Sequence, residues 1–432
     1  MEWYYTGLLL FAILIGYLVI GVPVAFSLGL AGITGVYLFL SPKLIFQLAR
    51  ISFDVASTQL FVVAPLFILM AGVVSQSDIA EKTFTAATKW LNWMPGSLGV
   101  STVAAATMFS AISGSSPATA AAIGYTAVPE MLRHGYDKRF AAGIVAAGGT
   151  LGILIPPSIV MIIYGIITET SIGALFAAGI VPGLVFSGLL MCYVMFRSRN
   201  QSRNESDAIV TWSDRFHSLP GIWPIILLFC IVMGAIYTGI ATPTEAAGFG
   251  ATAGLFLTLW RKGMGWTGLN IVLLRTAQTT AMLLLLIICG TFFGFVISQL
   301  GIAQDMVDAL VRANVSPWTV LLGYIGTLLV LGCLMDPASM MVITLPLAFP
   351  ILHKLGFDAV WIGVLVTVAV EIGMITPPVG LNLFILQGVV PKDINSMDIA
   401  LGALPFVFVL LLGLALLLLF PDIVLWLPRS LG

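Results

Sequence analysis

Charged residues are scarce in this chain. Asp, Glu, Lys and Arg make up only 9% of its 432 residues, whereas soluble chains carry about 25%. Hydrophobic residues make up 59%, and uncharged stretches include 3–42, 140–168 and 399–421. A membrane helix needs about 20 apolar residues. This composition excludes a water-soluble globule and predicts an all-α polytopic protein of the lipid bilayer.

Patterns that mark several other classes of function are also missing. The three histidines form no H-E-x-x-H pair, the four cysteines show no C-x-x-C spacing, and the dipeptide Gly-Lys does not occur. We therefore expect no zinc site, no disulfide framework and no phosphate-binding loop for ATP. A net charge of −1 also gives no electrostatic reason to expect nucleic acid as a partner. The N-terminus lacks the basic region and cleavage site of a signal peptide, so membrane helices are expected from the start.

The uncharged stretches divide into ten expected crossings. Two helices share 3–42, because Gly21-Val-Pro23 near its middle is typical of a tight turn. The other expected spans are 57–76, 140–168, 174–196, 219–238, 244–260, 276–298, 359–388 and 402–427.

Two further apolar stretches, 95–126 and 316–350, do not fit simple spans. Each has a polar cluster at mid-length, Ser113-Gly-Ser-Ser-Pro117 in the first and Asp336-Pro-Ala-Ser339 in the second. Non-helical backbone at membrane depth is tolerated only inside protein or beside a wet cavity. Each stretch is therefore expected to be a re-entrant helical hairpin with its tip inside the membrane. The alternative is a pair of short spans, which the arm length of about 14 to 18 residues disfavours.

The two halves of the sequence repeat with a period of about 220 residues. Pro95 matches Pro317 at an offset of 222, and Pro117 matches Pro337 at 220. The segment Gly152-Ile-Leu-Ile-Pro-Pro matches Gly373-Met-Ile-Thr-Pro-Pro at 221. Because the offset between matching residues changes so little over this length of chain, the sequence indicates internal duplication.

The distribution of basic residues predicts that the repeats are inverted, because cytoplasmic loops carry an excess of Lys and Arg. With ten crossings and the N-terminus outside, thirteen of the 18 basic residues lie inside. They are Lys82, Lys89, Arg133, Lys138, Arg139, Arg197, Arg199, Arg203, Arg215, Arg261, Lys262, Arg275 and Lys392. Five crossings then separate the hairpins, so the first opens to the cytoplasm and the second to the opposite side.

These features predict five segments along the chain. Scaffold helices occupy 1–56 and 218–274, and a cytoplasmic loop occupies 197–217. Repeat 1 covers 57–196, with a hairpin at about 95–126 and a broken helix at about 140–168. Repeat 2 covers 275–432, with a hairpin at about 316–350 and a broken helix at about 359–388.

The Pro156-Pro157 and Pro377-Pro378 pairs should unwind their helices, because proline lacks an amide donor and clashes with the preceding turn. Freed carbonyls, hydroxyls and amide oxygens are the ligands that sodium needs, and broken helices at a repeat interface are typical of secondary transporters. The alternative is that the small residues only permit close packing. The oxygen-bearing candidates for binding an ion or a substrate are Ser113, Gly114, Ser115, Ser116 and Ser158 in the first repeat and Asp336, Ser339, Thr376 and Asn382 in the second. Among them, the candidates for substrate contacts are Ser113, Ser116, Ser158 and Asn382.

Asp336 and Glu371 are the two carboxylates expected within the membrane. An unpaired charge there costs several kcal/mol, so each is a functional candidate. For Glu371 the alternative is a neutral or hydrogen-bonded carboxyl. No Lys or Arg is expected at the midplane, so an anionic substrate would rely on helix N-termini, hydroxyls and bound cations.

Four long motifs, taken in order, resemble one family. They are Phe109-Ser-Ala-Ile-Ser-Gly-Ser-Ser-Pro-Ala-Thr-Ala120, Gly152-Ile-Leu-Ile-Pro-Pro-Ser158, Thr238-Gly-Ile-Ala-Thr-Pro-Thr-Glu-Ala-Ala-Gly248 and Ile375-Thr-Pro-Pro-Val-Gly-Leu-Asn382. They look like the signatures of the large membrane subunit of tripartite ATP-independent periplasmic (TRAP) transporters, and the resemblance covers essentially the whole chain.

The resemblance implies an elevator-type, sodium-coupled importer of an organic acid, of the sialic acid or C4-dicarboxylate type, in a bacterial inner membrane. It also implies a separate small four-helix membrane subunit and a periplasmic substrate-binding protein as partners. No ATP is expected to be used. Two sodium sites are implied, one at each hairpin tip with its broken helix. They map onto Ser113, Gly114, Ser115, Ser116 and Pro156 in repeat 1 and onto Asp336, Pro337, Ser339, Thr376 and Pro377 in repeat 2.

Two other functions remain as alternatives to transport by this subunit. The serines between Ser113 and Ser116 suggest the nucleophile of an intramembrane hydrolase, but no histidine lies in an expected span to act as its base. A passive channel would leave the repeated Pro-Pro pairs and the membrane-embedded Asp336 unexplained.

Overall fold

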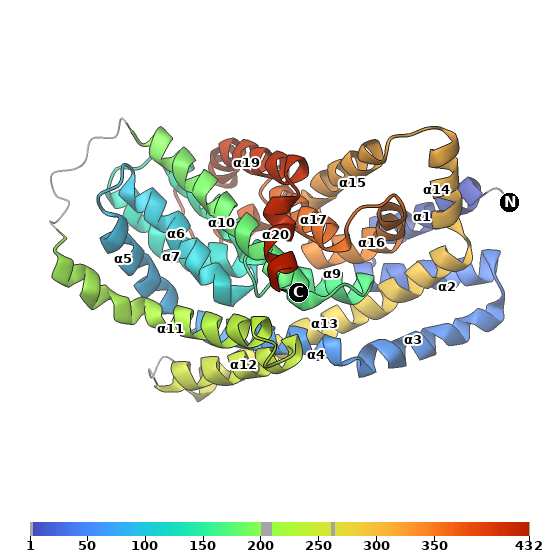
Figure 1. The fold of residues 1–432 in the computed structure, drawn as a ribbon, viewed down its shortest axis with the longest axis horizontal. Coiled ribbons are helices and arrows are strands. Elements are labelled where there is room, and N and C mark those ends of the chain that lie inside the picture. Colours follow the sequence, from blue (N-terminus) through green and yellow to red (C-terminus); the bar gives the residue numbers. More distant parts are fainter. Residues whose placement is uncertain (1–2, 200–209, 261–263, 432) are drawn as a thin grey trace.

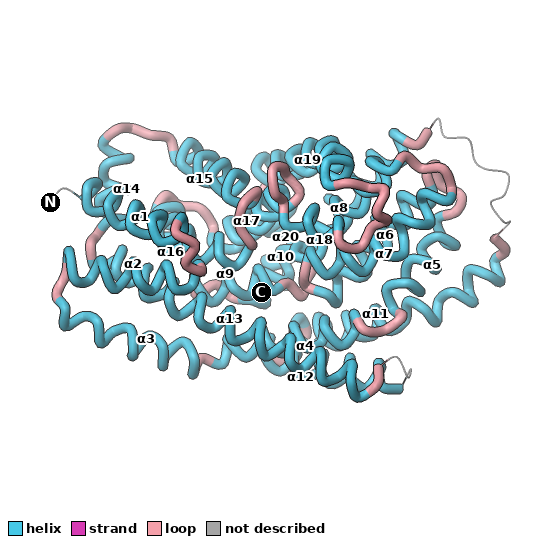
Figure 2. The backbone as a smooth tube through the Cα atoms, turned by 180° about the vertical axis from the view of Figure 1, so that it is seen from behind, coloured by secondary structure: helices cyan, strands magenta, loops and turns pink. Residues whose placement is uncertain are grey.

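The computed structural model describes residues 3–199, 210–260 and 264–431. Helices and their connections make up these ranges, and no strand occurs within them (Figure 2). The expected all-α class is therefore confirmed for the described part of the chain.

The N-terminal stretch forms two helices, as its Gly and Pro signals predict. The helices are α1 (Trp3–Val19) and α2 (Val24–Phe39). Gly21 has a φ of +86° between them, and Pro23 is the N-cap of α2. A short 3-10 turn, η1 (Pro42–Ile45), and α3 (Phe46–Ser57) follow. α3 meets the next helix at a bend of 56°.

The two repeats contain the same succession of helices. From the second helix of each series to the last, the starting residues are displaced by 220 to 224 positions. Repeat 1 contains α4 (Gln59–Ser75), α5 (Ile79–Leu91), α6 (Ser97–Ser113), α7 (Ser116–Arg133), α8 (Lys138–Leu154), α9 (Ile159–Thr168) and α10 (Ile172–Arg197). Repeat 2 contains α13 (Trp266–Gln299), α14 (Ile302–Arg312), α15 (Pro317–Gly332), α16 (Pro337–Lys354), α17 (Ala359–Met374), α18 (Leu381–Gln387) and α19 (Ser396–Leu419).

Each expected hairpin consists of two helices that contact each other, α6 with α7 and α15 with α16. Figure 1 shows the α6–α7 hairpin towards one end of the longest axis and the α15–α16 hairpin towards the other. Inversion concerns the direction in which each repeat crosses the membrane, so it stays a prediction.

Two helices connect the repeats, α11 (Trp212–Tyr237) and α12 (Pro243–Trp260). α11 begins inside the expected loop 197–217, because Thr211 and Asp214 form a capping box that makes polar residues part of its first turn. The rest of that loop, with Arg203, lies outside the described residues, as do Arg261 and Lys262. α13 likewise begins at Trp266, so the expected boundary between 274 and 275 falls inside one helix.

The last expected span, 402–427, is wrong at its C-terminal end. α19 stops at Leu419, and a separate helix, α20 (Asp422–Leu431), follows Pro421. A proline has no amide hydrogen to continue the helical ladder and clashes with the preceding turn, so the helix ends before it.

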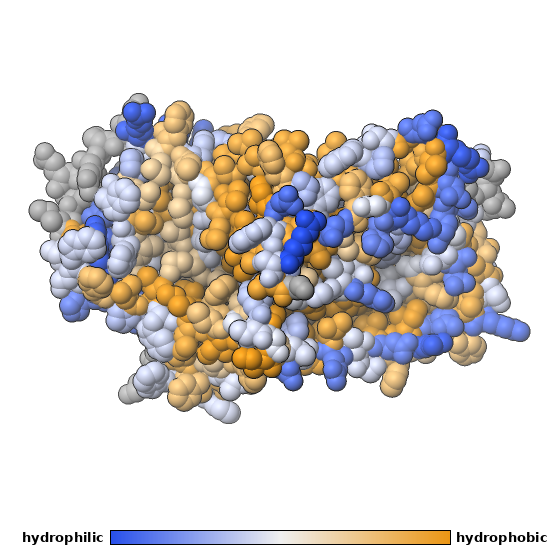
Figure 3. All heavy atoms as spheres, in the orientation of Figure 1, coloured by the Kyte–Doolittle hydropathy of each residue, from blue (hydrophilic) through white to orange (hydrophobic). Residues whose placement is uncertain are grey.

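The half-helices that precede the two breaks, α8 and α17, lie in the protein interior. The side chains of α8 from Ala141 onwards and of α17 from Trp361 onwards are buried, whereas only 39% of the most apolar window of α11 is buried. Figure 3 shows hydrophobic side chains over much of one face and hydrophilic ones gathered towards the end that carries α3 and α14. Unwound backbone is tolerated at membrane depth in such an interior.

Candidate substrate and cation site

The first helix break lies between Leu154 and Ile159, at the expected Pro156-Pro157 pair. Prolines supply no amide hydrogens, so the helical ladder stops here and must restart. Ser158 restarts it as the N-cap of α9, where its hydroxyl accepts from the Met161 amide at 3.3 Å. The same hydroxyl donates to the Ile153 carbonyl at 2.5 Å and so holds the two half-helices together across the break.

The first hairpin tip packs directly on this break. The Ile159 amide donates to the Gly114 carbonyl at 3.3 Å. Gly114 has a φ of +59°, and a Cβ there would lie 2.6 Å from the Pro157 carbonyl oxygen. Only glycine satisfies both conditions.

Hydroxyl groups fix the shape of the first tip from within. The hydroxyls of Ser113 and Thr119 are hydrogen-bonded at 2.6 Å, and Ser113 also donates to the Ser115 carbonyl at 3.0 Å. Ser115 caps α7 through the Ala118 amide at 3.4 Å. Thr119 was not among the sequence-predicted residues. It lies one helical turn after the N-cap Ser115, a spacing that could have suggested a hydroxyl directed towards the tip.

The second tip meets the second break in the same way. The Gly380 amide donates to the Cys333 carbonyl at 3.1 Å. Neither residue was singled out from the sequence. The helices approach so closely here that a Cβ on Gly332 would lie 2.8 Å from the Gly373 Cα.

The side chains predicted for the second cation site make local helix bonds. Asp336 is the N-cap of α16 and accepts from the Ser339 amide at 3.0 Å. Pro337 occupies the first turn of α16. The Thr376 hydroxyl donates to the Ile372 carbonyl at 2.6 Å, and Pro377 follows in the break. Within the described residues, no hydrogen bond joins Asp336 to Thr376, so their shared role as cation ligands stays a prediction.

The two repeats meet at the tips and breaks. The Asn382 amide group donates to the Ser116 hydroxyl at 2.5 Å, which joins the second break to the first tip. Helix α18 contacts α7, and α9 contacts α16. The Tyr164 hydroxyl donates to the Ala359 carbonyl at 2.7 Å, which adds a bond between α9 and α17. Two residues predicted as substrate contacts, Ser116 and Asn382, are thus brought together from opposite halves of the chain.

Three buried oxygen atoms in this region have no hydrogen-bond partner among the described residues. They are Oδ1 of Asn382 and both carboxyl oxygens of Glu371. Glu371 is 1% exposed and lies beside the backbone of Ile153, next to the first break. Oxygen acceptors without donors are suited to bind a cation or a protonated group. The Glu371 carboxyl, which is part of repeat 2, therefore lies next to the helix break of repeat 1. The sequence did not predict this placement.

A family model described as "Tripartite ATP-independent periplasmic transporter, DctM component" matches residues 11–423. The chain belongs to this family. It is 36% identical to the C4-dicarboxylate TRAP transporter large permease protein of Vibrio cholerae, over 98% of this chain and 97% of that one. The corresponding protein of Pseudomonas aeruginosa is 37% identical over 94% of each chain. The sialic acid TRAP transporter large permease of Vibrio cholerae is 31% identical over 96% of each.

Solved structures support the membrane-transporter fold of this DctM-family chain. The YdaH transporter of Alcanivorax borkumensis matches with a TM-score of 0.64 at 15% identity, covering 91% of each chain. MtrF of Neisseria gonorrhoeae matches with a TM-score of 0.53 at 12% identity, covering 88% of this chain and 83% of that one. The DctM-family chain is accordingly a multi-pass bacterial membrane protein, as expected from its sequence.

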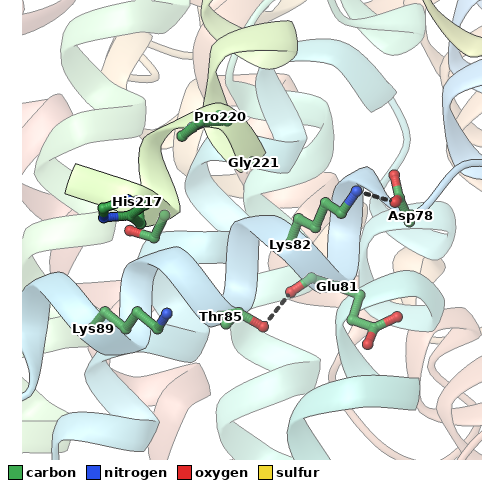
Figure 4. A pocket seen from close by; sticks show the side chains of 9 residues that line it. Asp78, Glu81, Lys82, Thr85, Lys89, His217, Pro220 and Gly221 are labelled. Carbon is green, nitrogen blue, oxygen red and sulfur yellow. Dashed lines mark hydrogen bonds and ion pairs between the residues drawn. The ribbon is translucent and has the colours of Figure 1, made fainter. Parts of the chain in front are cut away.

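A separate polar pocket of about 420 Å³ lies between α5 and α11 (Figure 4). Lys82 of α5 pairs with Asp78, and Glu81, Lys89 and His217 also line the pocket. These residues belong neither to the hairpins nor to the broken helices. The pocket is therefore distinct from the tip-and-break region of this DctM-family subunit.

Proposed function

We propose that this permease subunit imports an organic acid by coupling its movement to sodium. The contact between each hairpin tip and the break in its own repeat carries the proposal. It sets tip hydroxyls, helix-end carbonyls and capping oxygens beside unwound backbone, which is buried at the first break and partly exposed at the second. Such oxygens are the ligands that an alkali cation needs when it sheds its water.

Two cation sites follow from the repetition of this contact. The first uses Ser113 to Ser116 with the backbone at Pro156, and the second uses Asp336 to Ser339 with Thr376 and Pro377. Helix C-termini carry partial negative charge and unbonded carbonyls, which favours cations at the ends of α6 and α8. A substrate would lie between the repeats, where Ser116 and Asn382 meet. Movement of the two hairpins and broken helices as one body past the scaffold helices would give an elevator mechanism.

A C4-dicarboxylate is the first substrate to test. Relatives with this substrate in their names are 34 to 37% identical to the chain, whereas those named for sialic acid are 30 to 31% identical. An ectoine permease at 32% identity keeps a zwitterionic solute as a third candidate.

Transport should also need a small membrane subunit and a periplasmic substrate-binding protein. The relatives named large permeases imply a smaller partner, and a relative named permease protein DctMQ is longer, so that this chain covers 60% of it. Exposed hydrophobic side chains on α2 and α3, including Phe26 and Phe53, offer surface for a second membrane subunit.

The deciding experiment is uptake of a radiolabelled C4-dicarboxylate by liposomes that contain this chain and its small subunit, with the binding protein outside. We expect uptake only with an inward sodium gradient. Gradient-independent equilibration would favour a channel, and release of a cleaved product would favour a hydrolase. Robust, saturable uptake by the large subunit alone would contradict the partner requirement.

A further inference from the structure

An apolar cavity of about 670 Å³ lies between α1, α14, α15 and α16. Figures 1 and 2 both show these four helices grouped at one end of the molecule. Leu14 of α1 and Met306 of α14 face Val320 of α15 across the cavity, which extends to Met335, the residue before Asp336. The cavity therefore joins the N-terminal helix to the second hairpin and its tip.

The lining of this cavity is apolar apart from a few hydroxyls, most of which are bonded within the protein. The hydroxyls of Tyr324 and Thr344 are bonded to each other at 3.0 Å, and Thr344 also donates to the Met340 carbonyl. Thr327 donates to the Gly323 carbonyl at 2.9 Å. The exposed Thr319 hydroxyl alone would replace little of the hydration that an organic acid loses on entry, so the cavity suits a hydrocarbon rather than the transported substrate.

The position of the cavity selects one kind of hydrocarbon. Ile15 lines the cavity and is 56% exposed, and the neighbouring Leu322 of α15 is exposed as well. The cavity thus opens onto apolar outer surface of the kind that contacts bilayer chains.

We propose that this cavity binds one hydrocarbon chain of a membrane phospholipid. Bilayer chains reach the opening without crossing water, and a flexible chain fills an irregular space with dispersion contacts. The bound chain packs against α1 on one side and the second hairpin on the other. If the lipid's hydrocarbon chain fits better at one distance between α1 and the second hairpin than at another, it shifts the equilibrium towards the arrangement with that distance. The cavity is then a place where the bilayer acts on the hairpin that carries Asp336.

The test uses a phosphatidylethanolamine that carries a photoreactive diazirine at the end of one acyl chain, in vesicles of phosphatidylethanolamine and phosphatidylglycerol. After illumination, mass spectrometry of the intact chain's peptides should find label on α1 and α15 at cavity-lining positions. Wild-type protein without label there would overturn the proposal. Because this readout needs no substrate or sodium, it succeeds or fails independently of the proposed transport function.

Gly323→Phe should abolish this label. Gly323 lines the cavity, and a Cβ there meets no atom within 4 Å, so the ring enters the open space. Thr319→Phe, at a second lining position, should have the same effect. Gly326→Phe is the matched control, because Gly326 lies on the same helix, also has no atom within 4 Å of its Cβ, and is not part of the lining.

Equal labelling of α1 and α15 in Gly323→Phe, Gly326→Phe and wild type would overturn the proposal, since the label would then come from general contact with lipid. Adding the purified small subunit should leave wild-type labelling unchanged. Loss of the label on that addition would assign the opening to a subunit interface and would likewise overturn it.

Discussion

Gly114 combines two demands in a single residue of the first tip. Its φ of +59° costs any other L-residue about 1–2 kcal/mol. Its missing side chain lets the Pro157 carbonyl approach to a distance that a Cβ would not allow. The tip and the break are thus held together by backbone, and the surrounding hydroxyls remain available.

Gly114→Ala should therefore abolish uptake, because the methyl group pushes the tip away from the break. Gly135→Ala is the matched control: Gly135 also has a positive φ, +79°, but nothing lies within 4 Å of its Cβ. Both variants incur the backbone strain, and only Gly114→Ala adds the clash. Uptake assays at matched membrane expression compare them, and equal activity of the two variants would show that tip contact is dispensable.

Thr376→Val should raise the sodium concentration for half-maximal uptake. Valine keeps the shape of threonine and removes one oxygen, and a buried polar partner contributes about 1 to 3 kcal/mol, which corresponds to roughly tenfold or more in affinity. Thr367→Val provides the control, because Thr367 lies in the preceding helix, α17, outside the break, and its hydroxyl makes the same bond to a carbonyl four residues earlier. An identical sodium dependence in both variants would make Thr376 a packing residue.

Glu371→Gln should lower uptake strongly without preventing membrane insertion. The buried carboxyl has no hydrogen-bond partner among the described residues, so it requires a proton or a cation beside it. Glutamine has nearly the same shape, but it carries no negative charge to balance a cation and cannot take up and release a proton. Wild-type uptake by Glu371→Gln, measured with the same sodium gradient, would show that the carboxyl only fills space.

At the scale of elements, the Pro-Pro pairs coincide with both helix breaks, and the polar clusters coincide with the turns between α6 and α7 and between α15 and α16. The re-entrant course of these two helix pairs stays a prediction. These signals are local, because proline and glycine act through their own backbone. The helices α3, α5 and α14 were not predicted, since each is short and mixed in polarity and was counted as a connection between spans. The placement of Glu371 beside Ile153 was not predictable either, because packing of α17 on α8 decides it, not any local pattern.

One ion-pair cluster joins the beginnings of α8 and α19. Asp398 of α19, whose side chain is 4% exposed, contacts Lys138 Nζ at 2.6 Å and Arg139 Nε at 2.9 Å. The two cations are partly exposed, at 41% and 54%, so they recover some hydration when the carboxylate is lost. The cluster therefore links the first broken helix to the last helix of repeat 2 at one charged point.

Asp398→Asn should lower the melting temperature in detergent, because the charge-assisted bonds from Lys138 and Arg139 to the carboxylate are lost. Asp422→Asn breaks the exposed pair with Arg429, at 3.1 Å, and should have almost no effect. A thermal-shift assay on both purified variants makes the comparison. Equal melting temperatures would mean that the α8–α19 contact is held by apolar packing alone.

For the molecule as a whole, orientation in the membrane rests on the distribution of basic residues. A cysteine introduced into the expected cytoplasmic loop, for example at Ser202, would test this orientation, but Ser202 lies outside the described residues. Ser213, at the exposed start of α11, is used instead. Cys192 and Cys230 are exposed and would react as well. The experiment therefore needs a background in which all four cysteines are replaced.

In that background, a membrane-impermeant thiol reagent applied to intact cells should miss Ser213→Cys and label Ser430→Cys. Thirteen basic residues on the cytoplasmic side against five outside are the physical reason. Permeabilised cells, in which both positions should react, provide the control. The reverse pattern in intact cells would invert the assigned orientation and the side to which each hairpin opens.

The bonds from Ile159 to Gly114 and from Gly380 to Cys333 join main-chain atoms only. Such a bond needs no particular side-chain chemistry, although at Gly114 it needs the absence of a Cβ. The sequence repeat indicates an ancestral duplication, after which each half could change the chemistry of its tip and keep this contact: the residue before Pro117 is Ser116, whereas the residue before the matching Pro337 is Asp336. On the cation sites proposed above, the two halves would hold their ions with different oxygens, hydroxyls in one and a carboxylate in the other.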